Sequence, residues 1–416
     1  MKVFDATDVV VIGGGAVGCS IAYHLAKEGI DVILFERGNL ASGASGRCGG
    51  MVVQLYGREL NIDKTRKRLN LTQLNTHRLL ELQDKIGDFE YKQIGSFDIA
   101  VSEEEWNSLK KLVEIQHKLG DNEIELLDEK QTREIMPIFG DRTVFGSRYR
   151  PSDGNLNPFK LTYLLAGAAK KHGAVICTNT KIEEIIEDNG KVIGVRSCIG
   201  KTKAKWVVNA TNAWASQLTK EVEIIPVREI AMITEALPEL RSCPFEARFE
   251  GEFAYGATQT KDGNLLIGGP GLPTGEPGNY NYYDEFIRLS ETKRCAEYLC
   301  GFFPSLRHVN VIRSWAGTMA FTPDGVPFIG PIPNKEGLLV VAGFADGMAD
   351  AAAVGELITE YIAQGKFISI PMEIFDPGRP CPKIEWPHPY VHETLHEFLA
   401  KKYNNLELAN KRINQI

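Results

Sequence analysis

Several features that mark large classes of protein are missing from this sequence. Its eight cysteines form no C-x-x-C pair, so they show neither a disulfide framework nor the spacing of zinc or iron–sulfur ligands. We predict no metal site, and any iron–sulfur cluster that serves this protein should lie in another chain. The apolar stretches are far shorter than a membrane span, and Asp5 and Asp8 interrupt the first ten residues, unlike a secretory signal. We therefore expect a soluble, cytoplasmic protein with no transmembrane segment.

Excess positive charge is also missing. The 47 lysines and arginines are outnumbered by 54 aspartates and glutamates, the net charge is −7, and the longest basic run is the three residues at 66–68. Such a chain has no global field that would attract nucleic acid, so we predict no nucleic-acid partner. With 416 residues, 43% of them hydrophobic, the chain exceeds one ordinary core, and two domains are expected.

The most informative segment that is present spans residues 8–37 and reads DVVVIGGGAVGCSIAYHLAKEGIDVILFER. The β-branched run 9–12 predicts a buried parallel strand that ends in a glycine turn. Gly13 permits the tight turn, Gly15 lets a pyrophosphate approach the backbone, and Gly18 lets the next helix lie against the strand. The amino end of that helix faces the anion.

A second strand over residues 31–35 completes the unit and leads to Glu36. A carboxylate at this point accepts the hydroxyls of an adenosine ribose and disfavours a 2′-phosphate. Because strand, turn, helix, strand and acid occur in the expected order, we predict a dinucleotide site rather than a structural glycine turn. Its remaining predicted residues are Gly14, Ala16, Val17 and Arg37.

Further along the chain, periodicity predicts a long amphipathic helix over 61–86, a helix that Ser102 caps, and a helix over 158–172. The segment WVVNATNAWA at 206–215 predicts a strand and a second turn on the nucleotide side. Alternating residues between 223 and 303 predict an antiparallel sheet. A strand, a glycine turn and a helix follow over 338–362.

Four separated blocks together resemble the D-amino-acid oxidase type of FAD-dependent oxidoreductase. They are the βαβ unit, ASGASGRCGG at 41–50, the 206–215 block, and SWAGTMAFTPDGVPFIGP with VVAGFADGMADAAAVGELI between 314 and 358. The resemblance runs from Val9 to about Ile362. Within this superfamily, RCGGMVVQLYGRELN at 47–61 and RPSDGNLNPFKL at 150–161 look most similar to β subunits of dye-linked proline, hydroxyproline, opine and sarcosine dehydrogenases.

The resemblance implies an α/β plus α+β fold, in which a Rossmann-like FAD-binding domain is interleaved with a mainly antiparallel substrate domain. We assign 1–85, 152–222 and 311–370 to the FAD-binding domain, 86–151 and 223–310 to the substrate domain, and 371–416 to a C-terminal arm. The implied cofactor is noncovalent FAD, because Gly317 stands where some sarcosine oxidases carry the cysteine that attaches the flavin. Beyond the βαβ unit, the implied FAD-binding residues are Ser45, Gly46, Arg47, Cys48, Gly50, Ile182, Ala210, Thr211, Trp214, Gly317, Gly343, Phe344, Gly347, Met348 and Ala349.

Three residues in or beside these segments differ from the family pattern or carry a particular role. Arg47 is expected to supply positive charge to the phosphates, although a surface arginine in a glycine loop would look the same. Asn212 replaces a glycine that is usual in the turn beside the ribose. Asp346 is unusual close to a flavin, because an acid there opposes negative charge on the reduced ring unless it faces solvent.

The anchor for a substrate carboxylate is harder to identify. Met319 stands where glycine-oxidase-like members place an arginine, and Ala349 stands where sarcosine-oxidase-like members place a lysine. The remaining candidates are the three arginines and one tyrosine in blocks that line the flavin face in the family: Arg58, Arg228, Tyr255 and Arg313.

The implied reaction is FAD-dependent oxidation of a secondary amine or an imino/amino acid by hydride transfer, with electrons passed to a partner subunit or another acceptor. The implied partners are companion subunits that carry further redox centres. The sequence leaves open a self-sufficient oxidase that reduces oxygen, a noncatalytic flavoprotein subunit of an electron-transfer complex, and a hydroxy-acid dehydrogenase. The arm is expected either to dock on a partner, through Trp386, Tyr390, Leu395, Phe398 and Leu399, or to fold back on its own domain.

Overall fold

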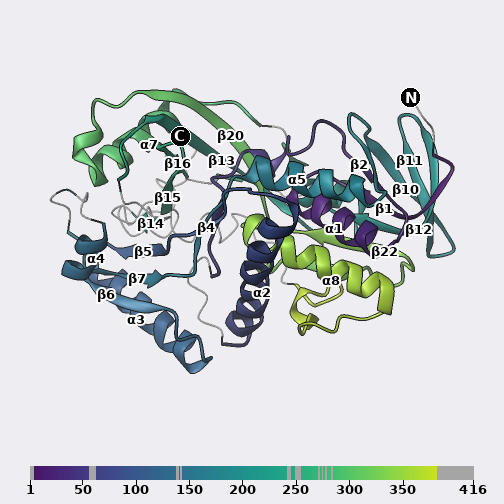
Figure 1. Cartoon of the computed structure of the whole chain (residues 1–416), viewed down its shortest axis with the longest axis horizontal. Helices are drawn as coiled ribbons and strands as arrows, with labels where there is room; N and C mark the ends of the chain where they lie inside the picture. Colours follow the sequence, from purple (N-terminus) through teal and green to yellow (C-terminus); the bar gives the residue numbers. More distant parts are fainter. Residues whose placement is uncertain are drawn as a thin grey trace.

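The computed structural model describes residues 4–55, 62–136, 140, 143–240, 245–248, 254–269, 272–273, 275–276, 279–282 and 284–381. Arg58, the side chain of Tyr255 and the arm beyond residue 381 lie outside this description. The described chain forms two lobes with the long helix α2 (Ile62–Ile86) between them (Figure 1).

The first lobe is built on an eight-stranded sheet whose centre is parallel. β1 (Ala6–Ile12) lies between β2 (Val32–Phe35) and β12 (Gly200–Asn209), and β9 (Val175–Cys177) and β22 (Leu338–Ala342) extend the parallel part. The remaining strands pair antiparallel: β10 (Ile182–Asp188), β11 (Lys191–Ser197) and β21 (Phe328–Pro331). Strands that begin at residues 6, 200 and 338 are thus part of one sheet.

Burial on both faces explains the unbroken apolar run of β1. Val9 and Val11 pack on one face, in the core shared with α1 (Ala16–Lys27), α5 (Pro158–Lys171) and α8 (Ala351–Gln364). Val10 and Ile12 pack on the other, against residues of β10, β11 and the short helices η2 (Asn212–Trp214) and α6 (Ala215–Leu218). A strand covered on both faces needs no polar alternation.

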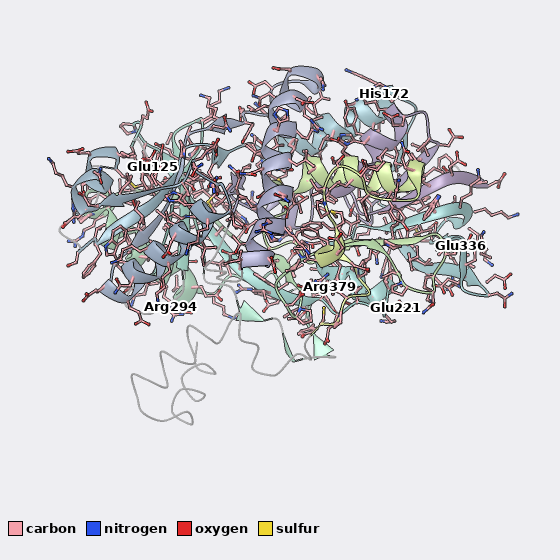
Figure 2. All side chains as sticks on the ribbon, turned by 90° about the horizontal axis from the view of Figure 1, so that it is seen from below. Glu125, His172, Glu221, Arg294, Glu336 and Arg379 are labelled. Carbon is pink, nitrogen blue, oxygen red and sulfur yellow. The ribbon has the colours of Figure 1, made fainter. Side chains whose placement is uncertain are left out.

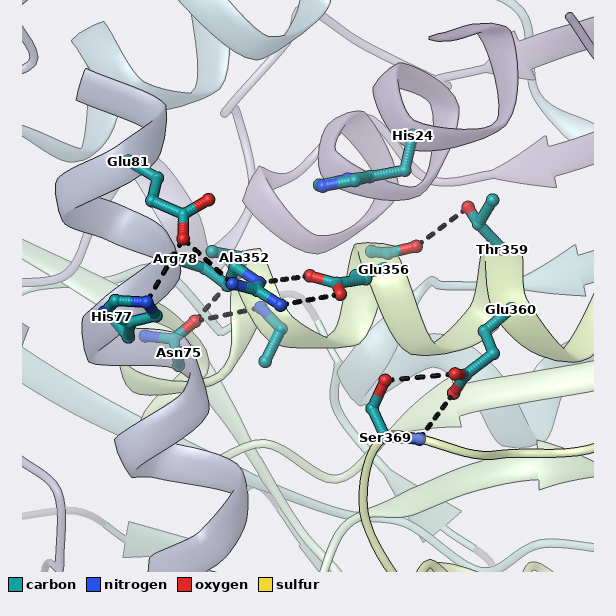
Figure 3. A network of polar contacts seen from close by, with 12 residues as sticks. His24, Asn75, His77, Arg78, Glu81, Ala352, Glu356, Thr359, Glu360 and Ser369 are labelled. Atoms are coloured by element: carbon teal, nitrogen blue, oxygen red, sulfur yellow. Dashed lines mark hydrogen bonds and ion pairs between the residues drawn. The ribbon is translucent and has the colours of Figure 1, made fainter. Parts of the chain in front are cut away.

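The helices α2 and α8 are joined by buried polar contacts (Figure 3). The Asn75 side chain of α2 accepts the Ala352 N–H (2.8 Å) and the Ala353 N–H (3.3 Å), and donates to the Met348 carbonyl (3.1 Å). One turn further along α2, Arg78 pairs with Glu356 and with Glu81. Asn75 therefore acts as the cap of α8, and these contacts fix α2 against the first lobe.

The second lobe is built on a nine-stranded sheet that is antiparallel except for one pair. Its order is β17 (Leu272–Pro273), β13 (Ile225–Ala236), β16 (Asn264–Gly268), β15 (Ala254–Gln259), β14 (Phe245–Arg248), β5 (Ser96–Ala100), β7 (Gly146–Arg150) and β6 (Glu125–Asp128), with β20 (Val311–Phe321) also on β13. Only β14 and β5 run parallel. α7 (Leu289–Phe302), α3 (Glu103–Lys118) and α4 (Glu129–Ile135) pack on this sheet.

Smaller elements complete the described chain. β3 (Met51–Val52), β8 (Gly154–Asn155) and β4 (Lys92–Gln93) form a three-stranded sheet, and β18 (Gly275–Glu276) pairs with β19 (Asn279–Tyr280). The short helices η1 (Ala44–Gly46), η3 (Pro304–Leu306), η4 (Gly347–Ala349) and η5 (Glu373–Phe375) lie in connections. Of the described helices, none is long and apolar enough to cross a membrane.

The predicted fold class is confirmed, and the predicted helix over 61–86 is present as α2. One boundary differs from our prediction: residues 311–321, which we assigned to the FAD-binding domain, form β20 and pair along their length with β13 of the second sheet. Its alternate residues Ala316, Thr318 and Ala320 are buried, and Ala320 packs in the core of the first lobe, so the strand contacts both lobes. The first described part of the arm also has a defined place. Phe375 is fully buried, and Arg379, labelled in Figure 2, binds Asp324.

Candidate functional site

A cavity of about 760 Å³ connects the two lobes. At one end it is lined by the glycine turn after β1 and by Glu36, and at the other by residues of the second sheet and of α2. A dinucleotide that places its ribose at Glu36 and its pyrophosphate at the turn therefore extends its remaining ring toward the second sheet.

The glycine turn has no room for side chains at two of its positions. Gly13 has φ of +116°, and a Cβ added there would lie 2.6 Å from the Ala210 carbonyl oxygen; at Gly18 it would lie 2.0 Å from the Gly13 carbonyl oxygen. Both positions therefore require glycine for backbone packing. Gly15 differs, because its added Cβ would meet only the Ser45 hydroxyl, at 2.9 Å. The Ser45 hydroxyl also accepts the Ala16 N–H at the start of α1 (3.0 Å), so Ser45 lies at the predicted pyrophosphate position.

Glu36 is oriented by the backbone on both of its oxygens. Its carboxylate accepts the Gly14 N–H (2.7 Å) and the Gly38 N–H (2.8 Å). Each carboxylate oxygen has a second lone pair, so the group can still accept ribose hydroxyls. Nearby, the Arg37 guanidinium stacks over the Trp214 ring at 4.0 Å, and both residues line the cavity.

Arg47 is held by protein groups rather than left free for phosphates. Its guanidinium donates to the Ala316 carbonyl (2.7 Å) and the Ser42 carbonyl (3.3 Å) and pairs with Glu285 (2.9 Å). A Cβ added to Gly317 would lie 2.9 Å from the Arg47 Cβ. Arg47 therefore occupies the space beside Gly317, and its charge is balanced by Glu285, a contact that the expectation of phosphate binding did not include.

Asn212 is a site residue whose role the sequence did not reveal. Its backbone has φ of +48°, which asparagine tolerates better than most residues. Its side-chain oxygen accepts the Gly343 N–H (2.9 Å) and the Phe344 N–H (3.0 Å). The replacement of the usual glycine thus ties the turn after β12 to the glycine turn after β22.

The half of the cavity that faces the second lobe is lined by apolar side chains together with Glu229 of β13. Its lining includes Met51, Leu55, Val227, Leu266 and Met319. Cys48 also lines it, and burial, the largest cause, raises the pKa of its thiol to about 11. The thiol is therefore protonated at neutral pH and is a poor nucleophile.

Arg68, Asp346 and Asp350 form a charged group at this end of the cavity. Arg68 and Asp346 line the cavity, and Arg68 Nη1 lies 3.6 Å from Asp350 Oδ2. Asp350 is buried, and neither of its carboxylate oxygens has a hydrogen-bond partner in the described chain. Burial raises the pKa of Asp350, and it raises the pKa of Asp346 to about 6 against the lowering effect of Arg68. Asp346 thus lies where its ionised form would oppose negative charge on a reduced ring.

Two of the four substrate-anchor candidates have other partners. Arg228 is buried and forms a paired contact with Glu291 (2.6 and 3.0 Å), with Asp284 3.6 Å away, and it does not line the cavity. Arg313 is exposed at the start of β20, 5.3 Å from the Trp315 ring, and also lies off the cavity. We therefore withdraw both as anchors: Arg228 stabilises the packing of α7 on β13, and Arg313 lies at the surface.

Most of the other predicted residues lie together. The predicted FAD-binding residues that line the cavity are Gly13, Gly14, Gly15, Ala16, Val17, Gly18, Glu36, Arg37, Ser45, Arg47, Cys48, Ile182, Ala210, Thr211, Trp214, Gly317, Phe344, Gly347 and Met348. Gly46, Gly50, Gly343 and Ala349 belong to the same segments but do not line it. In the described part of the chain, no group of three or more His, Cys, Asp or Glu residues is arranged to hold a metal ion.

Comparison with known proteins gives a family and several relatives. The family described as "DAO: FAD dependent oxidoreductase" matches residues 8–361. Mouse mitochondrial dimethylglycine dehydrogenase is 26% identical over 87% of this chain, but the chain spans only 43% of that relative's length. Glycine oxidase of Geobacillus kaustophilus is 27% identical over 85% of this chain and 92% of the relative.

Solved structures agree with the fold. The L-proline dehydrogenase of P. horikoshii is 29% identical, with a TM-score of 0.81 over 90% of this chain and 98% of that chain. The glycine oxidase structure from Geobacillus kaustophilus, at 24% identity, has a TM-score of 0.82 over 91% of this chain and shows likeness of fold.

Proposed function

Because the chain belongs to the DAO family of FAD-dependent oxidoreductases, whose members oxidise amino acids or amines, we propose that it acts on a secondary amine or imino/amino acid. The proposed substrates are of the proline, hydroxyproline, sarcosine or opine class. The similarity to an L-proline dehydrogenase over nearly the full length of both chains supports this class.

The observation that carries the proposal is the continuity of the cavity. It runs from the dinucleotide turn to the small and apolar residues of the second sheet, among them Gly256, Leu266 and Gly268. This arrangement leaves space for a small organic substrate beside the ring of the cofactor. The apolar side chains in this part of the cavity also keep water away from the substrate.

The residues that line the cavity fit FAD, and different residues have different roles in binding it. Bound FAD supplies the chemistry by accepting a hydride from the carbon next to the substrate nitrogen. Glu36 orients the adenosine end, and the amino end of α1 faces the phosphates. The turn that Asn212 holds lines the cavity through Phe344, Gly347 and Met348. β13 and β20 place Val227 and Met319 opposite that turn, where they exclude water from the substrate.

For the carboxylate anchor, Arg58 remains our proposal, with Tyr255 second. Leu55, Thr65 and Arg68 all line the cavity, so the segment that carries Arg58 begins and ends at the cavity wall. An arginine fork suits a carboxylate better than a lysine does. Tyr255 precedes Gly256, which lines the cavity on β15. We expect Arg58→Met to raise the KM for the substrate much more than it lowers kcat, with Arg58→Lys in between.

We further propose that the electrons pass to a companion subunit rather than to oxygen. The similarity to glycine oxidases keeps the oxidase as the second candidate. Both are tested by anaerobic mixing of the holoenzyme with proline, hydroxyproline, sarcosine, glycine and an opine. Bleaching of the flavin by one of the first three or by the opine supports the proposed substrate class, and bleaching by glycine alone contradicts it. Rapid recolouring in air then identifies an oxidase, and slow recolouring supports a separate acceptor.

A further inference from the structure

The function proposed above assigns no role to the charged group of Arg68, Asp346 and Asp350. It lies at the end of the cavity opposite the ribose acid Glu36, and so beside the flavin ring of a bound FAD. Two acids face one base there, which leaves one negative charge uncompensated when both acids are ionised. A buried uncompensated charge is costly, and the group lowers that cost by holding a proton.

Asp346 is the acid that can exchange this proton with the cavity. It lines the cavity, whereas Asp350 lies behind it, buried with unpartnered oxygens beside Arg68. No hydrogen bond from a described residue reaches the Asp346 carboxyl, so it is free to donate or accept toward a bound group. Burial raises its pKa to about 6, close to neutral pH, where a small electrostatic change alters its protonation.

The other charged or titratable groups around Asp346 are few. α2 presents Arg68 and α8 presents Asp350, and both act on the pKa of Asp346 in opposite directions. The segment before β3 presents the Cys48 thiol, whose own pKa is raised in part by Asp346 and by Glu229 of β13. On α1, His24 faces Glu356 and Arg78 instead. The pKa of Asp346 is therefore determined chiefly by its burial, by the cation Arg68 and by the anion Asp350.

We propose that Asp346 is a redox-linked proton site, which binds one proton from solvent when the flavin beside it is reduced. Hydride transfer brings two electrons and one proton to FAD and leaves one added negative charge at the ring. The negative charge raises the proton affinity of the Asp346 carboxylate, which becomes a neutral carboxyl group. The total charge of this end of the cavity is then the same before and after reduction.

The proposal predicts how the reduction potential depends on pH. The holoenzyme is reduced with dithionite and reference dyes in the absence of substrate, so the result does not depend on the proposed substrate class. One additional proton per two electrons changes the equilibrium tenfold per pH unit, which is about 30 mV. From pH about 6 up to the higher pKa that Asp346 takes on beside the reduced ring, the slope of the wild-type potential should therefore be about 30 mV per pH unit steeper than that of Asp346→Asn. Comparison with this variant cancels protonation of the ring itself.

Substitution of the two charged residues beside Asp346 should move this pH range in opposite directions. Arg68→Met removes the cation that lowers the pKa of Asp346, so the pH range in which the potential falls more steeply should begin at higher pH. Asp350→Asn removes the neighbouring anion, so the same range should begin at lower pH. Parallel potentials in wild type and Asp346→Asn would overturn the proposal. If Asp346→Asn does not retain FAD, infrared difference spectra of the wild type on reduction above pH about 6 decide: a new C=O band of a protonated carboxyl group that shifts in D2O supports the proposal, and its absence overturns it.

Discussion

Asn212 connects two segments of the cofactor site that lie 131 residues apart in sequence. We expect Asn212→Ala to weaken FAD binding on the order of tenfold, because two hydrogen bonds to the Gly343–Phe344 turn are lost and alanine is strained at positive φ. Asn212→Gly keeps the backbone conformation without the acceptor, and Asn212→Asp keeps the acceptor. Titration of the apoprotein with FAD should give the order wild type, Asp, Gly, Ala from tightest to weakest. Equal affinity of the glycine variant and the wild type would show that only the backbone conformation matters.

The attachment of FAD can also be predicted from single residues. Gly317 offers no thiol, Arg47 fills the space beside it, and the Cys48 thiol, with its pKa raised to about 11, is a poor nucleophile. We expect acid precipitation to release all of the flavin into the supernatant, measured by its absorbance. Flavin that stays in the washed pellet would contradict this, and digestion of the pellet would then identify the attached residue.

For single residues, the sequence predicted the roles of those whose partners are close along the chain. It did not predict the roles of those whose partners are distant along the chain. The glycine turn and Glu36 could be predicted because a fixed spacing within one βαβ unit determines their roles. The roles of Arg47 and Arg228 could not, because they depend on Glu285 and Glu291, which only the folded chain brings near. Asn212 was noticed as a departure, but the N–H groups that donate to its side-chain oxygen lie in another block, so its role was not predictable.

Among the elements, the contact of α2 with α8 determines the position of Arg68 and hence of the charged group. Asn75→Ala leaves the Ala352 and Ala353 N–H groups and the Met348 carbonyl without their partner in a buried place. We expect a loss of about 2 kcal/mol in the free energy of unfolding, the size of a lost helix cap plus an unpaired buried group. Denaturant unfolding measures this loss. Asn75→Asp, which keeps the acceptor for the two N–H groups, should lose less, and equal losses would show that the cap is unimportant.

Element types were largely predictable, because α2 has a helical period and β1 an unbroken apolar run. The sheet to which a strand belongs was not. β20 lies in a block that resembles the flavin side of the family, yet its backbone pairs with β13. Its neighbours in sequence gave no indication of this partner, since pairing over such separations depends on the whole fold.

For the whole molecule, residues 372–381 act as a strap that returns to the first lobe. Burial alone raises the pKa of Asp324, but the two bonds from Arg379 and other hydrogen bonds hold it below its ordinary value. A lowered folded-state pKa means that the pair stabilises the protein above the unfolded pKa of about 3.9, and that this stability is lost as pH falls further. Arg379→Met should thus cost about 2 kcal/mol at pH 7. The difference from the wild type should shrink in melting experiments below pH about 4, and a constant difference would contradict the role of the ion pair.

Because of the strap, the role of the arm is best tested with two truncated chains. A chain that ends after Cys381 keeps Phe375 and Arg379, and we expect it to retain FAD and its melting temperature. A chain that ends after Pro371 loses both residues and should melt at a lower temperature. If docking on a partner is the role of the arm, the chain ending after Cys381 should no longer co-purify with companion subunits. Loss of FAD from that chain would show instead that the removed residues complete this protein's own fold.

The central sheet of the first lobe has a consequence for the order of events during synthesis. β1 leaves the ribosome first, but its neighbour β12 follows some 200 residues later, and β22 follows only after residue 338. The turn that Asn212 holds against Gly343 therefore forms only after residues 343 and 344 have been synthesised. The early βαβ unit has to persist with the β1 edge unpaired until β12 has been synthesised, as expected for a fold of many distant contacts. We infer that FAD is captured only after β22 has been synthesised, and that a nascent chain stalled before β22 cannot retain the cofactor.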